Sequence, residues 1–335
     1  MSYRIILLIG VATLFFQCES KNGKDDFNTI ETLNYEEVSY PIELGRTHQL
    51  MIEKNILLLN DFHGDSVINV FDLNTSHIIR RLVGVGNGPN ELKSPIDIQN
   101  SDNYIYIYGR PFFTLLRVKK ENLDTSPLII EKLPQLPKLG DRILPLTDSL
   151  IVFSGMWGKR YALVNINDPT KILEFGDYPD MMEGEKDLPI EVKMMFHQSK
   201  FAKHPKETLF ISCSDYTAEI YEYNINGEEP ILKLRKLMEK YDYSFVSGQT
   251  VATSPNKENS PRIRAVTTSN KYICIVMGKK GADRETEIKI FDWEMKPIKK
   301  MVTDKYMMTM TIDDTNTAYA IIQDPEDMVV KFKLD

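Results

Sequence analysis

The 335-residue chain is poor in the residues that mark several large classes of protein. Its three cysteines are too few for a disulfide framework, and they form no Cys-x-x-Cys or Cys/His pattern typical of zinc sites. Lys and Arg total 41 against 48 Asp and Glu, a net charge of −7, and the lack of a basic block argues against nucleic acid as a partner. Glycine and proline, at 17 each, are too sparse for a collagen-like or low-complexity chain. After residue 16 no apolar run reaches eighteen residues, so no transmembrane helix is expected.

The N-terminus has the pattern of an export signal. A short positive start (residues 1–4) precedes an apolar run from Ile5 to Phe16, which is the size of a signal-peptide core. Cys18 follows directly and resembles the acylated cysteine in the lipobox of bacterial lipoproteins. Residues 1–17 are therefore predicted to be a lipoprotein signal peptide and Cys18 the lipidation site. The alternative is an uncleaved hydrophobic N-terminus with an incidental cysteine.

A polar, aperiodic segment follows Cys18, and residues 18–28 are predicted to be a flexible tether. Its Lys24-Asp25-Asp26 is similar to a signal that directs Bacteroidetes lipoproteins to the outer leaflet. These features predict an outer-membrane lipoprotein of the cell envelope, either periplasmic or surface-exposed. The lipid would be its only contact with the membrane.

The remainder of the chain consists of a repeated pair of β-rich runs. The first run of each pair starts 45 to 63 residues after the previous one, close to the period of propeller blades. The first runs are 56–60, 104–108, 149–153, 209–213, 272–276 and 318–322. The second runs are 67–73, 114–118, 161–166, 218–223, 287–292 and 328–334. Six pairs without alternating helices predict an all-β fold, a six-bladed β-propeller with four-stranded blades spanning residues 29–335; the alternative is a β-sandwich.

The two ends of the chain favour a closed ring. The last run stops at the C-terminus, which leaves its blade without an outermost fourth strand. The segment from Thr29 to Leu44 precedes the first complete blade and contains a β-rich run. We therefore expect an N-terminal strand to complete the last blade and to cover an open sheet edge.

A glycine-rich stretch, Gly84-Val-Gly-Asn-Gly-Pro-Asn-Glu91-Leu-Lys-Ser-Pro95, carries a family resemblance. It resembles the G-x-G-x-GP-x-E-[FL] stretch that follows the first blade of Bacteroidetes six-bladed propeller lipoproteins, the TolB-like propeller family. The resemblance implies a propeller located in the cell envelope and supplies no catalytic residues.

The same stretch does not fit a phosphate-binding loop, because no Lys-Ser/Thr follows and the next segment is extended. We interpret it as a tight turn between blades, in which glycines adopt positive φ and Glu91 accepts backbone hydrogen bonds.

Asp61, His63 and Asp65 stand at alternate positions and are weak candidates for metal ligands, with Glu91 as a fourth. The spacing lacks the remaining ligands of a calcium loop, and the segment is equally typical of a turn. No cofactor is predicted, and Ca²⁺ remains the one alternative.

Aromatic and cationic residues recur in the loops that a propeller gathers on one face around its central channel. These candidate ligand-binding residues are Arg110, Phe112, Trp157, Lys159, Arg160, Asp215 and Arg284. Stacking and bidentate arginine contacts would suit an anionic or sugar-like ligand. The alternative is a solvated charged rim in which Trp157 plugs the mouth of the channel.

Two long insertions interrupt the repeat, at about 178–199 and 236–262. The first is expected to pack onto the propeller as a lid, and residues 234–241 are expected to form one or two helical turns. Cys213 and Cys274 lie in apolar runs and are predicted to be buried thiols, with a disulfide between them as the alternative.

No nucleophile elbow or zinc-protease motif is present in the sequence. We therefore expect a monomeric, non-catalytic binding module for an envelope protein or a glycan-like ligand. The alternatives are a metal-dependent enzyme of lactonase or lyase type, with Asp61, His63, Glu91 and Asp215 as its candidate ligands, and a purely structural scaffold.

Overall fold

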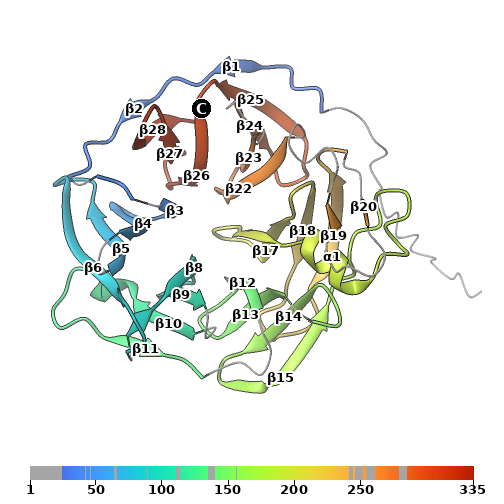
Figure 1. Ribbon diagram of the computed structural model, residues 1–335, viewed down its shortest axis with the longest axis horizontal. Helices are drawn as coiled ribbons and strands as arrows, with labels where there is room; N and C mark the ends of the chain where they lie inside the picture. Colours follow the sequence, from blue (N-terminus) through green and yellow to red (C-terminus); the bar gives the residue numbers. More distant parts are fainter. Residues whose placement is uncertain are drawn as a thin grey trace, which may run out of the picture.

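The computed structural model shows four-stranded sheets arranged radially around a central channel (Figure 1). It describes residues 25–41, 43–45, 47–63, 66–88, 90–110, 114–134, 140–155, 157–240, 244–245, 252–253, 261–278 and 285–335. Of residues 62–63, 94–96, 110, 244–245 and 252–253 it describes the backbone alone. The chain thus forms the predicted six-bladed propeller, and almost all of its regular structure is β.

Each blade is an antiparallel meander whose first strand lines the channel and whose last strand lies at the outer edge. Blade 1 contains β3 (Thr47–Glu53), β4 (Ile56–His63), β5 (Ser66–Asp72) and β6 (His77–Val85), with the short β7 (Glu91–Leu92) beside β6. Blade 2 contains β8 (Ser94–Asn100), β9 (Tyr104–Arg110), β10 (Thr114–Lys119) and β11 (Ile130–Lys132). Blade 3 contains β12 (Gly140–Pro145), β13 (Leu150–Gly155), β14 (Tyr161–Asn165) and β15 (Asp168–Phe175).

The second half of the ring repeats this arrangement. Blade 4 contains β16 (Lys200–Lys203), β17 (Leu209–Cys213), β18 (Thr217–Glu222) and β19 (Ile231–Leu237). Blade 5 contains β22 (Arg262–Thr268), β23 (Ile273–Gly278), β24 (Thr286–Phe291) and β25 (Pro297–Thr303). Blade 6 contains β26 (Tyr306–Ile312), β27 (Thr317–Gln323), β28 (Asp327–Lys333) and β2 (Glu36–Glu37). The predicted pairs of runs are the second and third strands of the six blades.

The N-terminal segment closes the ring, as predicted, and it does so on two blades rather than one. β2 pairs antiparallel with β28 and supplies the missing fourth strand of blade 6. Just before it, β1 (Ile30–Thr32) pairs in parallel with β25 as a fifth strand of blade 5. Between them, the backbone N–H of Leu33 donates to the Val302 carbonyl, and the Leu33 side chain is buried between these blades. The segment therefore covers two neighbouring outer edges, which Figure 1 shows as the blue strip over β25 and β28.

Residues 25–28 are also attached to the ring, although the sequence placed them in the tether. The Asp25 carboxylate lies 2.5 Å from the Lys236 ammonium, and both side chains are largely buried. Phe27 packs edge-on against Phe291, with ring centroids 5.4 Å apart. Only residues 18–24, which lie outside the described residues, are left for a tether.

The hydrophobic core lies between the blades, because both faces of an inner or middle strand are covered by neighbouring sheets. The three consecutive residues Leu57, Leu58 and Leu59 are all fully buried, since alternate side chains pack against opposite neighbours. Cys213 and Cys274 belong to two such interfaces and are free, buried thiols, as expected. Burial raises the pKa of the Cys213 thiol to about 12.

The two insertions differ from their predicted structure in one respect. The first carries a single short helix, α1 (Ile190–Phe196), whose Val192 is buried. Residues 231–237, where helical turns were expected from position 234, instead form strand β19. The edge of β18 requires a partner for its backbone groups, and the alternation in Ile-Leu-Lys-Leu-Arg-Lys-Leu suits a strand covered on one face. In the second insertion the structure describes a two-stranded pairing of β20 (Ser244–Phe245) with β21 (Ala252–Thr253).

Deletion of residues 27–44 tests the closure. We expect the shortened protein to lose cooperative thermal unfolding and to aggregate, because the outer edges of blades 5 and 6 become unpaired. Size-exclusion chromatography with light scattering and a thermal melt measure this outcome. The control is deletion of residues 1–24, which should leave the melt unchanged. A monomeric 27–44 deletion with an unchanged melt would contradict the role assigned to β1 and β2.

Candidate functional site

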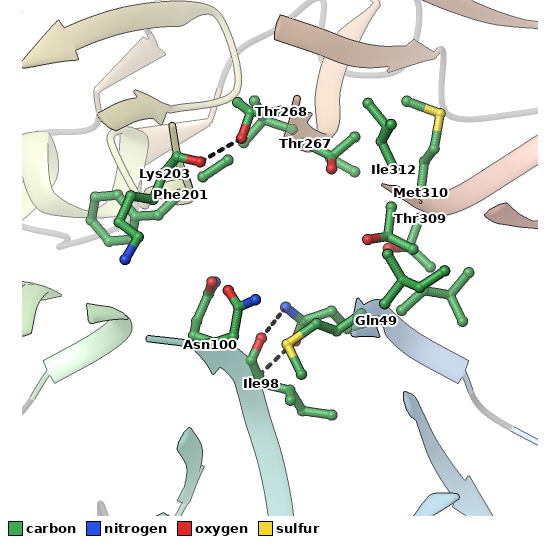
Figure 2. A pocket seen from close by; sticks show the side chains of 18 of the residues that line it. Gln49, Ile98, Asn100, Phe201, Lys203, Thr267, Thr268, Thr309, Met310 and Ile312 are labelled. Carbon is green, nitrogen blue, oxygen red and sulfur yellow. Dashed lines mark hydrogen bonds between the residues drawn. The ribbon is translucent and has the colours of Figure 1, made fainter. Parts of the chain in front are cut away.

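The first strands of all six blades enclose a central cavity of about 1190 Å³. Its wall is formed by β3, β8, β12, β16, β22 and β26 and the turns that follow several of them. Figure 2 looks into this channel and shows Asn100 and Thr309 pointing into its open centre. The channel is a large hollow bounded by all six blades and is the candidate functional site.

Hydrogen bonds between neighbouring inner strands hold the channel wall in place. The Gln49 amide of blade 1 donates to the Ile98 carbonyl of blade 2 at 2.7 Å and accepts from the Ile98 N–H at 2.8 Å. On the opposite side the Thr268 hydroxyl of blade 5 donates to the Lys203 carbonyl of blade 4 at 2.7 Å. Figure 2 shows both contacts as dashed lines. Because each contact joins two blades, the positions of the lining residues are fixed relative to one another.

Asp97 makes the corresponding contact between blades 2 and 3. Its carboxylate accepts the Ile143 N–H at 3.1 Å and the Gln99 amide at 3.1 Å. Burial raises the pKa of Asp97 to about 6, although the nearby Arg142 guanidinium and the Ile143 hydrogen bond favour the charged form. The channel wall thus holds a carboxyl group that binds its proton more tightly than an exposed aspartate does.

Three lysines that line the channel form ion pairs. Lys200 lies 2.9 Å from Asp215, Lys120 lies 2.6 Å from Glu53, and Lys203 lies 3.6 Å from Asp102. Between these pairs the wall presents amides and hydroxyls together with apolar side chains. Phe201 is the one aromatic residue in the described lining of the cavity. Such a surface suits a ligand rich in hydrogen-bonding groups and carrying some apolar groups.

Of the predicted ligand-binding residues whose side chains the structure describes, Asp215 is the one that contacts a residue of the channel lining, Lys200. It follows β17 and also approaches the Arg262 guanidinium at 3.7 Å, so it lies beside the start of the inner strands of blades 4 and 5. Lys159 is exposed and lies 4.0 Å from Asp177, away from the described lining of the cavity. The side chains of Arg110, Phe112 and Arg284, and the lipidation site Cys18, lie outside the described residues.

Trp157 and Arg160 are buried, which corrects their placement on a solvent-exposed rim. Trp157 packs with Tyr108 and Phe153 in the core between blades 2 and 3, and it is not part of the described channel lining. The Arg160 side chain is 1% exposed and lies 2.7 Å from the fully buried Glu219 carboxylate of blade 4. Loop position suggested exposure for both residues, but neighbouring blades cover the base of the loop that follows β13.

Glu219 is the centre of this buried polar cluster. Besides forming an ion pair with Arg160, it accepts a hydrogen bond from Arg235 at 2.5 Å and one from the Tyr161 hydroxyl at 3.0 Å. Burial disfavours the charged form of Arg160, but the Glu219 carboxylate together with the hydroxyls of Tyr161 and Tyr221 outweighs it and keeps the pKa of Arg160 above its usual value. The cluster therefore joins blades 3 and 4 through one carboxylate that pairs with two guanidinium groups.

Asp61 has a structural partner. Its carboxylate is fully buried and accepts the Gly45 N–H with both oxygens, at 3.0 and 3.2 Å. This contact fixes the link between β2 and β3. The His63 side chain and Asp65 lie outside the described residues. Among the residues whose side chains are described, no group of three or more His, Cys, Asp or Glu is placed to hold a metal.

Glu91 acts in the glycine-rich turn as predicted, while the role of the glycines differs. Its carboxylate accepts the Gly88 N–H at 2.7 Å. Gly86 and Gly88 do not adopt positive φ. Instead, a Cβ at Gly86 would lie 2.0 Å from Glu91 Oε2, and one at Gly88 would lie 2.9 Å away. The glycines are needed for the close approach of the carboxylate, which occupies the place that an anion would take.

Comparison with known proteins agrees with this geometry. A sequence model described as TolB-like 6-blade propeller-like matches residues 27–315. The chain belongs to the TolB-like propeller family. No curated protein sequence matches this TolB-like propeller significantly.

Two solved structures share the fold of the TolB-like propeller at low sequence identity. One is a putative exported protein from Bacteroides fragilis, with 13% identity and a TM-score of 0.56, covering 91% of this chain and 98% of that one. The other is a member of the DUF4221 family from Bacteroides vulgatus, with 11% identity and a TM-score of 0.54, covering 89% and 94%. In the described part of the propeller, no helix is long and apolar enough to cross a membrane.

The residues that line the channel of this TolB-like propeller were not among those predicted from the sequence. The inner strands mix polar and apolar residues, as in Thr-His-Gln-Leu-Met-Ile-Glu of β3, so they lack the apolar runs that identified the middle strands. Their position in the repeat was the available signal, because each inner strand directly precedes a predicted run.

The pH dependence of stability tests the state of Asp97. A carboxyl group with a pKa of about 6 when folded and 3.8 when unfolded binds its proton more tightly in the folded state. The bound proton therefore stabilises the folded state at low pH, and this stabilisation is lost as the pH rises through the folded pKa. The loss is about 1 kcal/mol between pH 5 and 7.5. Urea unfolding of the wild type and of Asp97→Asn at both pH values measures this. The variant should lose less stability over the interval, and equal losses in both proteins would refute the assignment.

Glu219→Gln tests the buried charge cluster. We expect a loss of about 3 kcal/mol in the free energy of unfolding, because Arg160 and Arg235 keep their charges without a buried counter-charge. The matched control is Glu222→Gln on the same strand, whose partner Lys233 is exposed, and this change should have little effect. Denaturant unfolding measures both variants, and equal effects would show that Glu219 is not the centre of the cluster.

Proposed function

We propose that this TolB-like propeller is a non-catalytic binding module exported to the cell envelope, where a lipid on Cys18 anchors it to the outer membrane. The sequence supports export and lipidation through the apolar run from Ile5 to Phe16 and the cysteine that follows. One fold relative is described as an exported protein. Export and lipidation are checked by fractionating cells and by mass spectrometry of the N-terminal peptide.

The ligand binds in the central channel, and the observation that carries this proposal is the cavity of about 1190 Å³ bounded by all six inner strands. Its wall combines hydroxyls and amides, such as Thr309 and Asn100, with apolar groups such as Val266 and Met308. Sugars are commonly held by stacking on aromatic rings, but the described lining offers Phe201 alone. The lining therefore favours a peptide segment of an envelope protein, which pairs amide groups and inserts apolar side chains. The propeller acts as a monomer and needs no cofactor for this role.

A photo-crosslinking amino acid at position 100 tests this function. In cells, we expect it to crosslink to one envelope protein, which mass spectrometry identifies and which is then purified for titration. The matched control is the same amino acid at Thr125, an exposed turn residue of blade 2, which should give no such product.

Affinity measurements with the purified partner complete the test. Thr309→Trp places a large side chain in the open centre of the channel and should weaken binding at least tenfold, while Thr125→Trp should not. Unchanged affinity in Thr309→Trp would show that the partner does not bind in the channel. If the label crosslinks to a glycan and not to a protein, the ligand is a sugar and the peptide proposal is wrong.

A further inference from the structure

The N-terminal segment is attached to the ring at a defined place, the outer edges of blades 4 and 5. The Asp25 carboxylate pairs with Lys236 on β19 of blade 4 at 2.5 Å. Phe27 packs on Phe291 of blade 5, and the same Lys236 ammonium lies 4.8 Å from the centre of the Phe291 ring. β1 then runs along β25 as the outermost strand of blade 5. The chain thus leaves the ring at its perimeter, and not at either face of the channel (Figure 1).

The short link to Cys18 limits how far this edge can move from a lipid attached there. Asp25 is the seventh residue after Cys18. A fully extended chain spans at most about 3.6 Å per residue, so the link reaches about 25 Å. A compact chain of this length is roughly 50 Å across, judged from the scaling of its radius of gyration. The far edge of the ring, at blades 1 and 2, therefore cannot face the membrane while the lipid is inserted.

The same edge exposes large apolar side chains. Ile30 on β1 is 61% exposed and Ile298 on β25 is 38% exposed. Ile30 pairs in parallel register with Lys300, so both isoleucines lie on the two outermost strands of blade 5. The outer strand of blade 4 adds Ile231, which is also exposed. The neighbouring Lys299 and Lys300 are largely buried and pair with Glu31 and Glu287. The exposed isoleucines of this edge suit the boundary between lipid headgroups and acyl chains.

We propose that the outer edge of blade 5, with Ile30 and Ile298, rests on the surface of the lipid bilayer that anchors the chain. This inference builds on the proposed lipidation of Cys18. The short link holds the edge at the membrane, and the isoleucines enter the interfacial region. The channel axis then runs along the membrane surface, so both of its mouths open to the solvent and to a partner protein.

Lipid quenching of a fluorescent label tests this orientation. The lipidated full-length protein carries one added cysteine, in Ile30→Cys, Ile298→Cys or Ile129→Cys, and is inserted into vesicles that contain brominated phospholipid. Cys213 and Cys274 are buried and Cys18 carries the lipid, so a bimane label reacts at the added cysteine alone. Ile129 is the matched control, because it is 62% exposed and lies beside β11 on blade 2.

We expect quenching at positions 30 and 298 to be at least threefold stronger than at position 129. Equal quenching at the three positions in vesicle-bound protein would overturn the orientation. A thermal melt of each labelled protein shows that the ring is intact.

Two further variants separate failure of the orientation from failure of the lipid anchor. Cys18→Ser should no longer float with the vesicles, and if it still floats, or if Cys18 carries no lipid, the proposed anchor itself is wrong. Insertion of twenty Gly and Ser residues between positions 24 and 25 should preserve flotation and reduce quenching at 298 to the level at 129. Unchanged quenching at 298 in that variant would show that the short link does not set the orientation.

Discussion

The pairing of the N-terminal segment with strands from the end of the chain is the contact on which the ring depends. Each blade buries its faces against its neighbours, so a ring with one unfinished blade leaves both a core surface and a strand edge exposed. β2 supplies that edge on blade 6, and β1 extends the cover to blade 5. Leu33, between them, inserts into the core that blades 5 and 6 share. The interface between blades 6 and 1 likewise joins the two ends of the chain, through a core that contains Leu57 and Ile321.

Closure also explains why the channel is a suitable place for recognition. The hydrogen bonds between Gln49 and Ile98 and between Asp97 and Ile143 join inner strands of adjacent blades. They can form only when neighbouring blades have the relative orientation that the closed ring imposes. The buried cluster around Glu219 does the same between blades 3 and 4, farther from the axis. A polar group buried in this way is costly unless its partners are in place. The lining side chains are therefore positioned by the whole ring and not by their own strands.

The fold could be predicted from the sequence because its middle strands are buried on both faces. Runs such as 56–60 and 209–213 are almost continuously apolar, and their spacing reports the blade period. The site was harder to predict, because exposure depends on neighbouring blades that have no local signature. Arg160 follows a loop-forming Trp-Gly-Lys and gives no sign in the sequence that Glu219, 59 residues later, neutralises it. The sequence correctly predicted that Glu91 accepts a backbone hydrogen bond in the turn. It did not show that Gly86 and Gly88 are required because the Glu91 carboxylate lies too close for a Cβ atom.

The strip formed by β1 and β2 also determines when the ring can be completed. Glu31 lies beside Lys299, 268 residues away in sequence, so this contact brings together almost the full length of the chain. Contacts of such separation cost the most chain entropy and are slow to form, which places ring closure late in folding. β1 and β2 leave the ribosome first, and they can pair only after β25 and β28 have been synthesised. A chain that stops before β28 leaves β2 without its partner. The N-terminal segment can therefore close the ring only when the chain extends through β28.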